Sequence, residues 1–377
     1  MAVNAVLLSA LSYGVYAAVV SNAQGPGFTG LGASSGSAPG LIDRLKGAST
    51  AVVPDKSQFL KPTDGDYFGA ATVKAPYDAK ELADFTTDDG GIHPTMASFF
   101  LQWNQKFNPY AITSAYDHGT IPVMTWEPWD GGTQNPAGGG VILQTNIKQP
   151  KYKLSNIYGG KFDTYITSVA TQIAAAKWPI VIRFAHEMNG AWYPWSEKVN
   201  GNAAGDYVKA WRHVHDVFEK AGATNVIWVW SPNIVRPVPN TALAPLYPGD
   251  AYVDWIGMTG YGVQENTPAT TFGATLTQIR KISKKPIMIM ETGAQPDRHQ
   301  TSWISAFFPW LKANPDVIGF IWMEKTRGTG ARADWRFTTN PKIQALFQTG
   351  LSTLRLTTGQ PASATSASPS PSSASTP

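Results

Sequence analysis

The sequence contains no cysteine among its 377 residues. Disulfide bonds, thiolate metal sites and thiol nucleophiles are therefore excluded. Charged residues are also scarce, at 15%, and the 30 basic and 26 acidic residues form no dense run of one sign. We expect no nucleic-acid partner, because such partners are bound by clustered Lys and Arg side chains.

Large apolar side chains are abundant instead. Hydrophobic residues make up 43% of the chain, and there are 14 Trp, 14 Tyr and 16 Phe. This composition is typical of a globular protein with a large core. Some of the Trp side chains could instead lie in an open cleft, where their flat faces would stack on sugar rings. Composition leaves both possibilities open.

The two ends of the chain differ in composition from the middle. Residues 5–20 are mostly apolar but too short for a clear membrane span, and small residues follow them. We expect residues 1–24 to be a signal peptide or an N-terminal anchor, so that the protein is secreted or held at a membrane. Residues 25–61 are predicted to be a flexible linker, 62–352 the folded domain and 353–377 a disordered Pro/Ser-rich tail.

Short apolar runs recur through the predicted domain. Each is almost continuously apolar, which is typical of strands buried on both faces of a parallel sheet. The runs are Tyr67–Val73, Ala97–Trp103, Ile121–Trp126, Ile180–Phe184, Val226–Trp230, Trp255–Met258, Ile287–Met290 and Val317–Trp322.

The segments between these runs can form helices. Phe162–Ala176, Tyr207–Phe218 and Thr271–Ile282 each place apolar residues three and four positions apart. Strands that alternate with helices predict an α/β fold, and eight such units predict a closed (β/α)8 TIM barrel. An open doubly wound sheet is the alternative. It would need a Gly-rich phosphate loop after the first strand, and Val73-Lys74-Ala75-Pro76 is not one.

Two carboxylates stand where apolar strands end. The fourth run is followed by His186 and Glu187, and the seventh ends directly at Glu291. The carboxyl ends of the strands carry the active site in (β/α)8 enzymes. Paired carboxyl groups can cleave a glycosidic bond, since one donates a proton while the other attacks or stabilises the sugar. A metalloprotease HExxH motif is excluded, because its fifth position is Gly190.

At these residues the sequence resembles glycoside hydrolase family 26, whose members are retaining β-glycanases best known as endo-β-1,4-mannanases. The resemblance runs from about Tyr67 to Arg336. Its most specific motif is HEMNGAWYPW at 186–195. Weaker matches lie at 121–129, 228–233, 254–257 and 285–293.

The resemblance implies a role for several side chains. Glu187 would be the acid/base and Glu291 the nucleophile. His186 would line the subsite where the bond breaks, and Tyr261 would donate a hydrogen bond to the nucleophile. Asn189 would also contact the substrate, and Trp192 and Trp195 would be sugar platforms. Arg183 would orient a carboxylate or form a structural salt bridge. Trp126 and Trp322 would be either platforms or core residues.

The predicted function is therefore hydrolysis of a β-glycan by a monomeric retaining endo-glycanase, with no metal or organic cofactor. Endo-β-1,4-mannanase is the first expectation, and mixed-linkage β-glucanase and β-1,3-xylanase are alternatives within the family. A transglycosylase and a non-catalytic carbohydrate-binding barrel would also fit these residues. Glu324, after the eighth run, is a third candidate carboxylate in a segment that does not match the family residue by residue.

Overall fold

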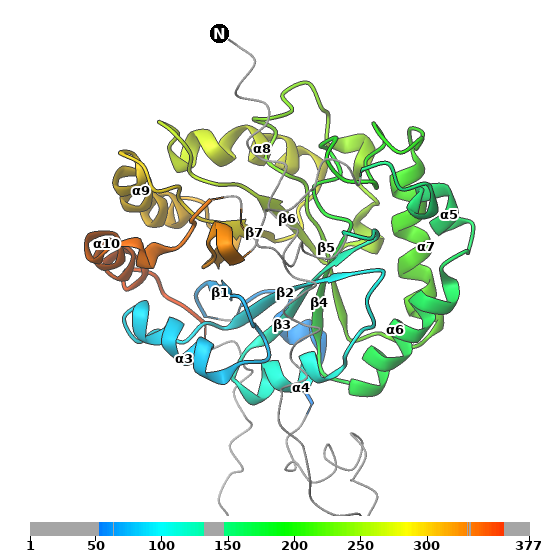
Figure 1. The fold of residues 1–377 in the computed structure, drawn as a ribbon, viewed down its shortest axis with the longest axis horizontal. Helices are drawn as coiled ribbons and strands as arrows, with labels where there is room; N and C mark the ends of the chain where they lie inside the picture. The colour runs from blue at the N-terminus through cyan, green and yellow to red at the C-terminus, as the bar shows by residue number, and fades with distance from the viewer. Residues whose placement is uncertain (1–52, 63, 132–146, 330, 332, 358–377) are drawn as a thin grey trace, which may run out of the picture.

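The computed structural model describes residues 53–62, 64–131, 147–329, 331 and 333–357. Within these residues, eight parallel strands form a closed barrel in the order β1 to β8, with β8 paired to β1. Helices surround the barrel on the outside, as Figure 1 shows. The predicted (β/α)8 fold is confirmed, and the open doubly wound sheet is excluded.

The strands lie close to the predicted apolar runs. They are β1 Tyr67–Ala71, β2 Met96–Gln102, β3 Ile121–Glu127, β4 Ile180–Phe184, β5 Val226–Trp230, β6 Trp255–Thr259, β7 Ile287–Thr292 and β8 Val317–Met323. Every residue of these strands is buried. The helices are α3 Ala79–Asp88, α4 Tyr110–Asp117, α5 Leu154–Tyr158, α6 Asp163–Ala176, α7 Asp206–Lys220, α8 Pro268–Ile282, α9 Gln300–Lys312 and α10 Pro341–Leu351.

Local sequence explains where the helices begin and end. Thr267 caps α8 by accepting a hydrogen bond from the Thr270 backbone, and Pro268 occupies the first turn, where its missing N–H leaves no hydrogen bond unmade. The left-handed backbone of Lys177, with φ of 65°, ends α6 directly before β4. The three helices predicted from apolar spacing, α6, α7 and α8, each have a buried apolar face.

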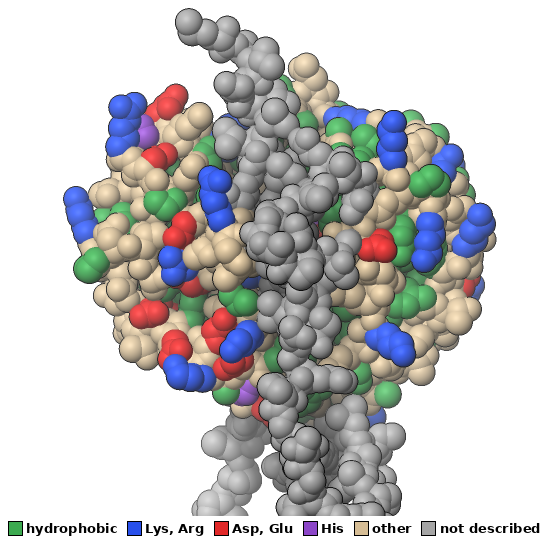
Figure 2. Space-filling model, in the orientation of Figure 1, with side chains coloured by type: hydrophobic (Ala, Val, Ile, Leu, Met, Phe, Trp, Pro, Cys, Tyr) green, Lys and Arg blue, Asp and Glu red, His purple; other side chains and the backbone are tan. Residues whose placement is uncertain are grey.

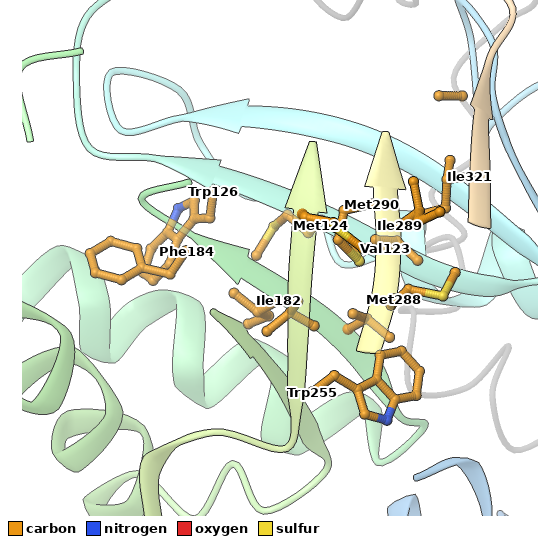
Figure 3. Close-up of a cluster of buried hydrophobic side chains, with 14 of the residues drawn as sticks. Val123, Met124, Trp126, Ile182, Phe184, Trp255, Met288, Ile289, Met290 and Ile321 are labelled. Atoms are coloured by element: carbon orange, nitrogen blue, oxygen red, sulfur yellow. The ribbon is translucent and has the colours of Figure 1, made fainter. Parts of the chain in front are cut away.

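Successive strand residues alternate between the barrel interior and the helix layer. Trp126 of β3 faces outward, where it packs against Phe184 of β4 and Phe218 of α7. Figure 3 shows Trp126 and Phe184 side by side. Its neighbours in sequence, Thr125 and Glu127, therefore face the interior.

The N-terminal segment of the described chain is part of the folded domain. Residues Lys56–Phe59 form the 3-10 helix η1, and Phe59 is 2% exposed. The Tyr67 hydroxyl donates to the Phe59 carbonyl at 2.9 Å, and Lys56 forms a salt bridge of 3.3 Å with Asp254. The domain therefore begins before residue 62. It also extends past 352, because Asp66 pairs with Leu356. Composition did not reveal these anchors.

We expect Phe59→Ala to lower the free energy of unfolding by roughly 3–5 kcal/mol, the usual effect of removing a buried aromatic ring. The measurement is urea unfolding followed by circular dichroism. Lys61→Ala, which changes an exposed residue of the same segment, should leave the unfolding midpoint unchanged. A Phe59→Ala protein as stable as wild type would show that η1 is only loosely attached.

The predicted signal peptide or anchor, 1–24, lies outside the described residues. Among the helices of the described part, none has the length and apolar character needed to cross a membrane. On the face shown in Figure 2, basic and acidic side chains are interspersed over the surface.

Candidate active site

Arg183 connects four strands inside the barrel. It lies on β4 and is 0% exposed. Its Nε donates to Ser231 Oγ at 2.9 Å, and Nη1 lies 3.5 Å from Thr125 Oγ1. Nη1 also donates to Glu291 Oε1, and Nη2 donates to Thr259 Oγ1. The fixed fork of the guanidinium group thus holds the Glu291 carboxylate in one orientation.

Two donors hold the Glu291 carboxyl group. Oε1 accepts from Arg183, and the Tyr261 hydroxyl donates to Oε2 at 2.7 Å. Tyr261 is itself fixed by stacking on Trp335, with ring centroids 4.2 Å apart. Burial raises the pKa of the Glu291 carboxyl group well above its usual value, and the charge of Lys325 opposes this rise. The direct contacts with Arg183 and Tyr261 favour the carboxylate form.

Glu187 lies in a different setting. Its backbone is left-handed, with φ of 54°, and its N–H donates to the Ser231 carbonyl at 2.8 Å. Its Oε2 accepts from the Trp192 indole at 2.7 Å. Among the described residues, Oε1 has no hydrogen-bond partner although it is buried. A non-glycine residue in this backbone conformation is uncommon, and such strained residues cluster at active sites.

Burial raises the pKa of both acids, and their direct contacts distinguish them. Burial raises the pKa of Glu187. The charge of Arg183 and the nearby Asn233 and Trp192 side chains only partly oppose this rise in pKa. Among the described residues no cation forms a salt bridge with Glu187, whereas Glu291 contacts a guanidinium group. Such a pair suits one carboxyl group that keeps its proton and one that is ionised.

We expect Trp192→Phe to move the alkaline limb of the pH profile of kcat/KM to higher pH. The indole hydrogen bond lowers the pKa of Glu187, so its loss raises that pKa and keeps the acid protonated to higher pH. The measurement is initial rate against pH. An unchanged or lowered alkaline pKa would contradict the assignment of Glu187 as the acid.

Gly190→Ala is a second way to disturb the same contact. A β-carbon at position 190 would lie 2.4 Å from Cε2 of Trp192, which is closer than packed atoms tolerate. The indole would have to move, and we expect the same direction of pH shift.

His186 is enclosed by aromatic rings and fully buried. Tyr193 lies 4.9 Å and Trp195 5.7 Å from it, centroid to centroid. Burial and the nearby Arg183 charge lower the pKa of His186 well below its usual value. The imidazole is therefore neutral at neutral pH and can exchange hydrogen bonds without adding charge to the site.

Three of the four tryptophans expected as possible sugar platforms are buried. Trp195 is 0% exposed, stacks on Tyr193 and donates to the His186 carbonyl, so it is not an open sugar platform. Trp126 and Trp322 are likewise core residues, since both are 0% exposed and pack against helices. Trp192 is partly exposed and beside Glu187.

Two polar residues considered for the site, Asn189 and Glu324, form hydrogen bonds that hold loops in place. The side-chain amide of Asn189 makes two hydrogen bonds with the backbone of Asn233. Its Nδ2 donates to the carbonyl and its Oδ1 accepts from the N–H, which ties the loop after β4 to the segment after β5. Glu324 accepts from the Phe337 backbone and from Thr338 Oγ1 at 3.1 and 2.6 Å. Its carboxyl group therefore holds the segment after β8 and is not placed with Glu187 and Glu291.

The sequence analysis did not single out Glu127 and Lys325. Glu127 ends β3, Lys325 follows β8, and they are 1% and 3% exposed. Strand alternation could have indicated Glu127, because it lies two residues after Thr125, which contacts Arg183 in the interior.

Comparisons with known proteins show which family the sequence matches. The family model for glycosyl hydrolase family 26 matches residues 111–338. Among curated proteins, endoglucanase H of Acetivibrio thermocellus is 31% identical over 266 residues, which is 66% of this chain and 26% of that protein. A mannan endo-1,4-β-mannosidase of Caldalkalibacillus mannanilyticus is 32% identical over 163 residues, 41% of this chain and 30% of that protein.

A third relative is a β-1,3-xylanase of a Vibrio species. It is 24% identical over 211 residues, 48% of this chain and 42% of that protein. The chain thus spans less than half the length of each of these relatives.

Solved structures agree on the fold. GH26A from a Muricauda species has a TM-score of 0.54 and 21% identity, and covers 83% of this chain and 95% of its own. A β-mannanase from Bacteroides ovatus has a TM-score of 0.54 and 19% identity, and the match covers 78% of this chain and 90% of that chain. Because the family model matches more than half of the sequence, this chain belongs to glycosyl hydrolase family 26.

Proposed function

We propose that the protein is a retaining endo-acting β-glycanase, with Glu187 as acid/base and Glu291 as nucleophile. The observation that carries this proposal is the unequal setting of the two acids. Arg183 and Tyr261 hold Glu291, whereas a buried oxygen of Glu187 has no hydrogen-bond partner among the described residues. That oxygen can carry a proton to the leaving group.

The reaction follows from this arrangement in two steps. Glu291 attacks the anomeric carbon while Glu187 protonates the glycosidic oxygen, which breaks the bond and releases the aglycone. Glu187, now ionised, takes a proton from water as the water attacks the glycosyl-enzyme ester. The sugar leaves with its original configuration, and both carboxyl groups return to their starting states.

We propose β-1,4-mannan as the substrate, which is supported by the similarity to mannan endo-1,4-β-mannosidases from several organisms. β-Glucan is the second candidate, because the match to an endoglucanase covers 66% of this chain. β-1,3-Xylan is a weaker third candidate at lower identity.

The test is incubation of the full chain with galactomannan, glucomannan, mixed-linkage glucan and β-1,3-xylan. Products are resolved by size, and the anomeric configuration is followed by NMR in the first minutes. We expect short oligosaccharides from one glycan, formed first as the β-anomer. Binding without any release of reducing ends would favour a carbohydrate-binding barrel. Products longer than the substrate, at high acceptor concentration, would favour a transglycosylase.

We also propose that the protein acts outside the cell as a monomer. The apolar segment 5–20 and the small residues after it support export. Detection of the protein in culture medium tests the location, and sedimentation equilibrium tests the oligomeric state. Retention of all activity in the cytoplasm would contradict the first proposal, and a dimer mass would contradict the second.

A further inference from the structure

Glu127 is a buried carboxyl group that takes no part in the two reaction steps. It is the last residue of β3 and pairs in register with Gln102 of β2. Its side chain faces the interior, two residues beyond the Thr125 hydroxyl that lies near Arg183. It is 1% exposed. Glu127 therefore lies at the carboxyl end of the barrel, close enough to the acid Glu187 for the charge of Glu187 to act on it.

One oxygen of this carboxyl group lacks a hydrogen bond. Oε1 of Glu127 is buried and has no partner among the residues that the structure describes. Burial raises the pKa of Glu127 to about 8; the nearby Trp129 side chain and Arg183 oppose this rise, and the charge of Glu187 adds to it. A buried acceptor without a donor is costly, so such groups usually have a reason to persist. A donor supplied by a bound molecule is one such reason.

Lys325 adds a buried amine to this region. It follows β8, is 3% exposed, and its Nζ lies 5.1 Å from the centre of the Phe100 ring. Phe100 in turn contacts His186, with ring centroids 6.4 Å apart. The charge of Lys325 acts on both Glu291 and Glu127. An amine donor and a carboxyl acceptor therefore border the catalytic pair from β8 and β3.

We propose that Glu127 and Lys325 bind hydroxyl groups of the sugar held between Glu187 and Glu291, and so help to determine which glycan is accepted. This inference rests on the proposed function and names two specificity residues beyond it. A sugar hydroxyl donates to Glu127 Oε1, and a second hydroxyl oxygen accepts from Lys325 Nζ. Neighbouring hydroxyls on one ring present this combination of a donor and an acceptor.

The experiment measures binding without turnover. Glu291→Gln, which should not hydrolyse, is the parent protein. Mannohexaose, cellohexaose and a mixed-linkage glucan tetrasaccharide are titrated into it by calorimetry. Three further substitutions are added to this parent one at a time: Glu127→Ala, Glu127→Gln and Lys325→Met. Glu265→Gln, an exposed residue after β6, is the matched control.

We expect the Glu127→Ala protein to bind its best oligosaccharide about 10- to 100-fold more weakly than the parent, the usual effect of leaving a buried hydrogen-bonding group of the partner unsatisfied. Lys325→Met should weaken binding in the same direction, and Glu265→Gln should not change it. An affinity of the Glu127→Ala protein within twofold of the parent would overturn the proposal, whatever its thermal stability.

Two further outcomes are distinct. If Glu127→Ala has no cooperative unfolding transition, Lys325→Met decides in its place, because it removes the amine donor, and an affinity within twofold of the parent overturns the proposal. Glu127→Gln keeps an acceptor oxygen in the same shape and is the conservative control, which should bind more tightly than Glu127→Ala. If wild type cleaves none of the four polysaccharides while binding still depends on Glu127, the proposed hydrolase function fails and this inference stands.

Discussion

Glu291→Gln is expected to lower kcat/KM on the preferred glycan by roughly 10⁵-fold or more, as for the loss of a nucleophile in other covalent mechanisms. The amide cannot form the glycosyl ester. It also leaves the Arg183 guanidinium, which is 0% exposed, without the negative charge that it contacts. The measurement is release of reducing ends at matched concentrations of folded protein.

A control is needed because an unpaired buried charge also destabilises the fold. The thermal unfolding midpoint of Glu291→Gln should therefore be recorded and the assays run well below it. Glu324→Gln changes a buried Glu outside the catalytic pair, whose carboxyl group accepts hydrogen bonds from Phe337 and Thr338. We expect it to remain active. If Glu291→Gln kept more than a tenth of wild-type activity, the nucleophile would have to be another group.

Glu187→Ala is expected to lower kcat/KM on a polysaccharide by about 10²- to 10⁴-fold, the usual contribution of a general acid–base group. The loss should depend on the leaving group. A sugar leaving hydroxyl needs a proton, whereas a dinitrophenolate leaves without one, so the first step on an aryl glycoside should be little affected. The glycosyl-enzyme should then accumulate, because no base activates water.

Azide provides the decisive measurement for this variant. A small anion can attack the glycosyl-enzyme without a general base, and the space vacated by the Glu187 side chain gives it access. We expect azide to accelerate turnover of the aryl glycoside and to form the β-glycosyl azide. Formation of the α-azide, or equal losses on both kinds of substrate, would contradict the assignment of Glu187 as acid/base in a retaining mechanism.

Much of the fold could be predicted because a parallel barrel leaves a simple pattern. Strands buried on both faces appear as apolar runs, and all eight were located to within about two residues at each end. The strand ends then pointed to Glu187 and Glu291, because a carboxyl group that ends an apolar strand is unusual. The residues around them come from distant parts of the chain, so their contacts with Arg183 were not visible in the sequence.

The tryptophans show where sequence reasoning failed. Trp195 and Trp192 stand three residues apart in one motif, yet one is fully buried and the other is partly exposed. The direction of each indole depends on the irregular loop after β4, which has no periodicity to predict it. Trp126 could have been placed by alternation, because it adjoins two residues that face the interior.

The contacts of Arg183 link the shape of the active site to the integrity of the whole barrel. Its guanidinium group joins side chains from β3, β6 and β7 and the residue after β5. The Glu291 carboxylate is therefore oriented only when those strands are closed around it. A ligand that binds this folded arrangement will, by mass action, raise the free energy of unfolding of the barrel. Bound substrate therefore stabilises the folded barrel against unfolding.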